Sequence, residues 1–123
     1  MTEAELVEHA QMAYGNAIAA FALMFTMLSA YLVAAYLAGK ALSFSQMLTV
    51  NLFFIVSVVM TIAAEASFLS AALNSSLEAF AINPARAVIP LHSSIAGIVA
   101  LIDLLIMIGC LKFMWDVRHQ DSD

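Results

Sequence analysis

Three long apolar runs dominate the pattern of hydrophobic and polar positions along the chain. They extend from about Asn16 to Ala38, from about Met47 to Ala64 and from about Ile95 to Leu111. A single charged residue, Asp103, interrupts the third run. Because charge-free apolar runs of about 18 residues or more predict membrane-spanning helices, the pattern indicates an all-α integral membrane protein with three spans.

Polar residues mark where the helices should begin and end. Thr2 and Glu5 have the spacing of a capping box, in which each side chain bonds the backbone N–H of the other residue. Ser43 and Gln46 repeat that spacing before the second apolar run. Gly39 suits the left-handed backbone conformation that often follows a helix. The predicted helices cover about 3–38, 44–82 and 90–118.

The second predicted helix is longer than a membrane requires. The chain has no Gly or Pro from Ser45 to Ile82, whereas about 20 residues are enough to cross a bilayer. The excess should tilt the helix or project into solvent. Since no repeat or second domain is visible, we expect residues 1–123 to form a single membrane domain, an antiparallel bundle of three transmembrane helices.

The composition of the chain supports a membrane location and limits the kinds of molecule expected to bind the protein. Hydrophobic residues make up 64% of the chain and charged residues 11%, compared with about 25% charged residues in soluble domains. The net charge is −5 and no cluster of Lys and Arg exists that could bind phosphate, so nucleic acid is not expected as a partner. The expected partners are the lipid bilayer and other membrane helices.

Lys and Arg residues near the ends of the spans predict the orientation. Lys40, Lys112 and Arg118 fall on one side of a three-span protein, and Arg86 alone falls on the other. Cytoplasmic loops carry an excess of Lys and Arg, so we expect the N-terminus outside and the C-terminus in the cytoplasm. The aromatic residues expected near the cytoplasmic interface are Tyr31, Tyr36 and Trp115.

Residues 83–86 read Asn-Pro-Ala-Arg, and at this motif the sequence resembles aquaporins. In that family the Asn caps a half-helix and the Arg lines the selectivity filter, so the resemblance implies a water path at Asn83 and Arg86. Pro90 follows Pro84 by only six residues, which leaves no room for a re-entrant half-helix and its return. We therefore interpret the motif as a turn and the likeness as coincidental.

In overall layout the chain resembles small three-span bacterial inner-membrane proteins that have no assigned activity. The shared features are the acidic start, the tyrosines of the first helix and the closing sequence LKFMWDVRH. The resemblance implies a location in the bacterial inner membrane and supplies no activity.

Two ionisable residues, Glu65 and Asp103, lie inside the predicted membrane helices. Ionisable groups at membrane depth usually face a bundle interior or a water-filled cavity. Helical spacing places Glu65 on one face with Asn51, and Asp103 on one face with His92. Each of these helices therefore has one stripe that should face protein rather than lipid.

The depths of the two acidic residues predict different partners for them. An axial offset of about 10 Å, at about 1.5 Å per residue, would be too large for the carboxyl groups to share a proton. We expect Glu65 to meet His92 and Asn16 near the outer ends of their helices. Asp103 has no basic residue at its own depth, and burial favours the neutral carboxyl group, which can donate a hydrogen bond.

Small residues recur every four positions on two of the helices. Such stripes let membrane helices approach closely, which favours association without a hydrophobic driving force. One stripe could serve the bundle itself and the other a neighbouring subunit. The predicted helix-packing residues are Ala30, Ala34 and Ala38 on the first helix and Ala63, Ser67 and Ala71 on the second.

These features favour a protein that acts by helix–helix assembly, as a homo-oligomer or as an accessory subunit of a larger membrane complex. The alternative is an oligomeric ion or proton channel, or a proton-coupled carrier, that uses Asp103 and Glu65. No enzyme activity, cofactor or metal is expected, because no catalytic motif is present and the three histidines lack the close spacing of metal ligands.

Overall fold

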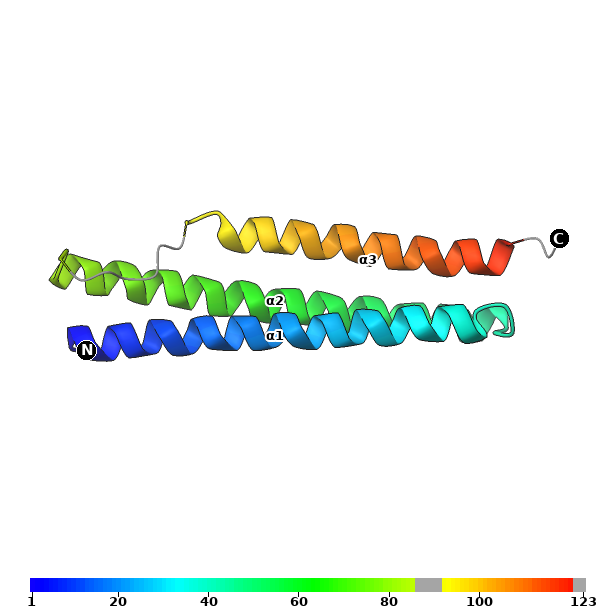
Figure 1. The fold of residues 1–123 in the computed structure, drawn as a ribbon, viewed down its shortest axis with the longest axis horizontal. Helices are drawn as coiled ribbons and strands as arrows, with labels where there is room; N and C mark the ends of the chain where they lie inside the picture. Colours follow the sequence, from blue (N-terminus) through cyan, green and yellow to red (C-terminus); the bar gives the residue numbers. More distant parts are fainter. Residues whose placement is uncertain (86–91, 121–123) are drawn as a thin grey trace.

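The structure is a computed structural model that describes residues 1–85 and 92–120. Within them α1 covers Glu3–Ala38, α2 covers Phe44–Ile82 and α3 covers Ile95–His119. The three helices lie side by side in an elongated bundle, in which α2 returns along α1 and α3 runs in the direction opposite to α2 (Figure 1). Each helix is long and apolar enough to cross a membrane.

The helix ends follow the signals in the sequence, with an exception at the start of α3. Both predicted capping boxes are confirmed, and in the first Thr2 N–H donates to Glu5 Oε2 at 2.6 Å. The expected start of the third helix near residue 90 is wrong, because residues 92–94 are not helical and α3 begins at Ile95. Serines at 93 and 94 favour such positions, since their hydroxyls compete for backbone hydrogen bonds.

A side chain of α3 closes the turn between α1 and α2. Gly39 was expected in the left-handed conformation, but it continues the right-handed helical backbone with φ −53° and ψ −41°. The Arg118 guanidinium donates to the carbonyl oxygens of Gly39 and Leu42 at 2.8 and 2.7 Å, so these carbonyls need no left-handed cap. A Cβ atom at residue 39 would clash with the backbone carbonyl oxygen of Ala35 in α1 and would lie 3.2 Å from Val117 Cγ1 in α3, so glycine fits this position.

Side chains from all three helices form an apolar core in the half of the bundle near this turn. Tyr31, expected at the membrane interface, is buried there, and its ring stacks on Phe54 with 3.9 Å between centroids. Its hydroxyl donates to Asn51 Oδ1 at 2.7 Å, which satisfies the buried polar end of the ring. The other buried members of the core are Met24, Leu28, Ala35, Met47, Val58, Met107, Cys110 and Met114.

Charged residues collect at the two ends of the bundle. The acidic end, where α1 begins and α2 ends, contains Glu3, Glu5, Glu8 and Glu78. The opposite end contains Lys40, Lys112, Asp116 and Arg118. In the described helices between these ends, the charged residues are Glu65 and Asp103 alone, and both are buried.

The helices differ in length. α1, α2 and α3 contain 36, 39 and 25 residues, so at about 1.5 Å per residue they are roughly 54, 58 and 38 Å long. The hydrocarbon core of a bilayer is about 30 Å thick. The excess length of α1 and α2 lies at the acidic end, where both extend beyond the start of α3 (Figure 1).

Candidate functional site

Glu65 of α2 and Asp103 of α3 form a buried pair of carboxyl groups. The two residues are 2% and 0% exposed, and their carboxyl groups lie close enough to interact with each other. The prediction that an axial offset would keep the two groups apart is therefore wrong. They are the only charged residues in the apolar part of the described helices, and the fold brings them together.

Two features of helix geometry explain this contact. Leu69 and Ile95 border one cavity together with Glu65 and Val99, so α3 begins beside the middle of α2 and not beside its end. Asp103 lies one turn beyond Val99, about 6 Å at 1.5 Å per residue. The helices α2 and α3 run in opposite directions (Figure 1). Because Cβ atoms tilt toward the N-terminus of their own helix, the two acidic side chains should lean toward each other.

The two carboxyl groups can form a hydrogen bond with each other only when the pair holds a proton. As carboxylates, Glu65 and Asp103 have oxygen atoms that only accept, and no other described residue donates to them. The buried hydroxyl of Thr61, one turn before Glu65, donates to the backbone carbonyl of Ser57 at 2.9 Å. A proton on one carboxyl group supplies the missing donor and removes the repulsion between two like charges.

The partners that the sequence suggested for Glu65 lie elsewhere. His92 is exposed, and its Nδ1 atom is 2.6 Å from Ser94 Oγ in the segment before α3. Asn16 has an exposed side chain on α1. The predicted meeting of Glu65 with His92 and Asn16 is wrong, because His92 precedes α3 and does not belong to its buried face.

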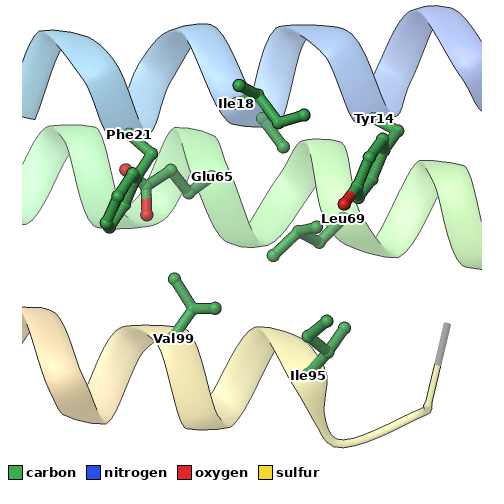
Figure 2. A pocket seen from close by; sticks show the side chains of 8 residues that line it. Tyr14, Ile18, Phe21, Glu65, Leu69, Ile95 and Val99 are labelled. Atoms are coloured by element: carbon green, nitrogen blue, oxygen red, sulfur yellow. The ribbon is translucent and has the colours of Figure 1, made fainter.

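A cavity of about 230 Å³ opens between the three helices beside Glu65 (Figure 2). Apart from the Glu65 carboxyl group and the Tyr14 hydroxyl, the side chains that line it are apolar. In Figure 2 the carboxyl group points toward the end of the cavity lined by Phe21 and away from Tyr14. The apolar lining includes Ile18 and Phe21 of α1, Leu69 of α2, and Ile95 and Val99 of α3.

The sequence did not identify Tyr14 and Phe21 as neighbours of Glu65. They are seven residues apart and so share one face of α1. This spacing is the feature of the sequence that could have shown that both residues line one site. The helix that this face meets depends on packing between segments that are distant in the sequence.

The small residues predicted for helix packing lie mostly on the outside of the bundle. Ala38 and Ala71 are half-buried. The exposed ones are Ala30, Ala34, Ala63 and Ser67. The small residues buried inside the bundle are instead Ala10, Ala13, Ala17, Ala35, Ala72, Ser75, Ser76 and Ala79. The exposed positions therefore do not pack this bundle.

The Asn-Pro-Ala sequence lies directly after α2. Asn83 N–H donates to the carbonyl oxygen of Ala79 at 3.0 Å, and Asn83 Oδ1 accepts from Ala85 N–H at 3.2 Å. Such local bonds are typical of an Asn that begins a turn, which agrees with the interpretation made from the sequence. Arg86 lies outside the described residues.

Neither a search for metal ligands nor a comparison with known proteins points to a function for this chain. In residues 1–85 and 92–120, no group of three or more His, Cys, Asp or Glu side chains is placed to hold a metal ion. Comparison of the chain with protein-family models, with curated proteins and with solved structures gave no match. Function must therefore be inferred from the chain's own chemistry and geometry.

Proposed function

We propose that this chain is an integral membrane protein whose three spans form an antiparallel bundle in a bacterial inner membrane. The distribution of charge supports this proposal, because Glu65 and Asp103 are buried and the other charged side chains of the described helices lie near the two ends. The exposed surface between the ends carries large apolar side chains, which suit contact with lipid. Examples are Phe25, Phe53, Met60 and Leu105.

Exposed hydroxyl groups on this surface bond within their own helices. Thr26 donates to the carbonyl oxygen of Ala22 at 3.1 Å, and Ser29 donates to that of Phe25 at 2.9 Å. Thr49 and Ser67 make the same type of bond. A polar group that faces lipid must be satisfied without water, so these bonds fit a lipid-facing surface.

For the orientation, we propose an outside N-terminus and a cytoplasmic C-terminus, from the distribution of Lys and Arg. In a Cys110→Ala background, Glu3→Cys should react with a membrane-impermeant thiol reagent on intact cells, and Gln120→Cys should not. Both cysteines should react after the cells are permeabilised, which controls for accessibility. Labelling of residue 120 but not of residue 3 on intact cells would reverse the orientation.

Within the membrane, the protein acts by helix–helix assembly, as a homo-oligomer or as an accessory subunit of a larger complex. The observation that carries this proposal is the outward position of small residues such as Ala30 and Ala34 on α1 and Ala63 on α2. Small side chains let the backbones of neighbouring helices approach closely, which favours association in lipid. A neighbouring subunit could approach most closely along these residues.

The substitution Ala34→Phe tests the assembly proposal. A phenyl group at this position should hold the neighbouring backbone away and lower the association constant by about tenfold or more. The readout is the mass of the protein in mild detergent. Val33→Phe is the matched control, because Val33 is adjacent, 57% exposed and off the line of small residues. Equal effects of the two changes, or a lone wild-type monomer without a co-purifying partner, would contradict the proposal.

The Glu65–Asp103 pair favours a second candidate function, an oligomeric proton or cation channel or a proton-coupled carrier. Ionisable residues at membrane depth commonly mark ion pathways and proton relays. The cavity beside Glu65 extends toward Tyr14 and Ile95, and so toward the acidic end of the bundle (Figure 2). Three helices cannot enclose a pore by themselves, so this function also requires assembly.

A further inference from the structure

We propose that the cavity beside Glu65 binds a small hydrophobic ammonium ion, with the Glu65 carboxylate as its counter-ion. Such binding needs neither assembly nor transport, so it can fail while both functions proposed above survive. The proposal depends on the charge of the carboxyl pair, on the chemistry and size of the cavity, and on where the cavity opens.

The carboxyl pair supplies an uncompensated negative charge. When the pair holds one proton, Glu65 and Asp103 together carry a single negative charge in an apolar interior. No Lys, Arg or His is among the described residues that line the cavity. Apart from the other carboxyl group of the pair, no residue in the described part of the chain donates to the carboxylate oxygens, although Glu65 is only 2% exposed. Buried charges are normally paired, so a cation beside Glu65 would complete the site.

The wall of the cavity suits a cation that carries an apolar body. Phe21 and Tyr14 place aromatic rings at its two ends, and aromatic faces attract ammonium ions (Figure 2). Ile18, Leu69 and Val99 offer apolar contact between them. A strongly hydrated inorganic cation would gain little from these side chains, whereas an alkyl or benzyl ammonium would use both kinds of contact.

Size and access limit the ligand further. A cavity of about 230 Å³ holds roughly eight water-sized groups at about 30 Å³ each, so the ligand should have on the order of ten non-hydrogen atoms. Ile18 and Phe21 in its wall are 55% and 40% exposed, so the cavity opens on the outer surface of the bundle. In a membrane this surface faces lipid, and a ligand that enters from lipid must itself be hydrophobic.

Titration of the whole protein with benzyltrimethylammonium in a neutral maltoside detergent tests this proposal. Isothermal titration calorimetry should show saturable binding of one ion per chain. The neutral isostere neopentylbenzene, in which carbon replaces the charged nitrogen, should bind at least about tenfold more weakly, because it forms no ion pair with the carboxylate. Empty detergent micelles provide the background for both compounds.

Two glutamates on the same helix provide a matched pair of variants. Glu65→Gln should lower the affinity for the ammonium ion at least about tenfold, because it removes the counter-ion. Glu78→Gln makes the same change at an exposed position near the end of α2 and should leave the affinity unchanged within about twofold. Circular dichroism should show that both variants remain helical.

Three outcomes would overturn the proposal: no saturable binding to the wild type, equal binding to Glu65→Gln, or equal binding of the neutral isostere. If Glu65→Gln does not fold, the comparison of the two isosteres on the wild-type protein still decides the question.

Discussion

Replacing Asp103 with leucine should lower the free energy of unfolding by about 1 to 3 kcal/mol, because Glu65 then keeps a buried carboxyl group without a partner. Replacing both residues with leucine removes both polar groups together. The double variant should recover most of the loss, since apolar replacement of a whole buried pair is often neutral. We therefore expect the double variant to be more stable than the Asp103→Leu protein.

A double-mutant cycle measures this effect through reversible unfolding in mixed detergent micelles. The coupling energy between Glu65→Leu and Asp103→Leu should be at least about 1 kcal/mol, as for residues in direct contact. A cycle between Asp103→Leu and Glu78→Leu is the control, because Glu78 is exposed near the acidic end and should show no coupling. Additive effects of Glu65→Leu and Asp103→Leu would contradict the direct contact between their carboxyl groups.

Asp103→Asn should preserve helix packing but abolish any proton flux through liposomes that contain the protein. The amide keeps the shape of the side chain and can donate a hydrogen bond to Glu65, but it cannot exchange a proton near neutral pH. Flux is measured with a pH-sensitive dye inside the liposomes. Glu78→Gln, which removes an exposed carboxyl group from α2, is the control and should retain the wild-type flux.

The flux measurement separates the two candidate functions. Wild-type flux that disappears in Asp103→Asn but persists in Glu78→Gln would support the channel or carrier. Proton flux that persists in Asp103→Asn would exclude a proton path through the two carboxyl groups. If the wild-type protein shows no flux, assembly is the function that stands.

The limits of α1 and α2 could be predicted because they depend on residues close together in the sequence. Thr2 with Glu5 and Ser43 with Gln46 make their bonds across a single helical turn. The apolar runs were likewise recognised from the hydropathy of consecutive residues alone. Gly39 was misinterpreted because its cap comes from Arg118, which is 79 residues away along the chain.

The partners of buried polar groups could not be predicted, because they depend on the placement of one helix along another. A shift of about three helical turns, roughly 16 Å, decides whether Glu65 meets His92 or Asp103. The sequence does not fix that shift, since α3 follows a connection of 12 residues between Ile82 and Ile95. Tyr31 is a similar case, because the partner of its hydroxyl group, Asn51, lies on the next helix.

A proton held between Glu65 and Asp103 can be observed directly by infrared spectroscopy, because a protonated carboxyl group has a C=O stretching band that a carboxylate lacks. At neutral pH we expect this band in the wild-type protein. It should be absent from the double variant Glu65→Gln/Asp103→Asn and unchanged in the exposed control Glu78→Gln. A wild-type spectrum without the band at neutral pH would contradict a shared proton in the buried pair.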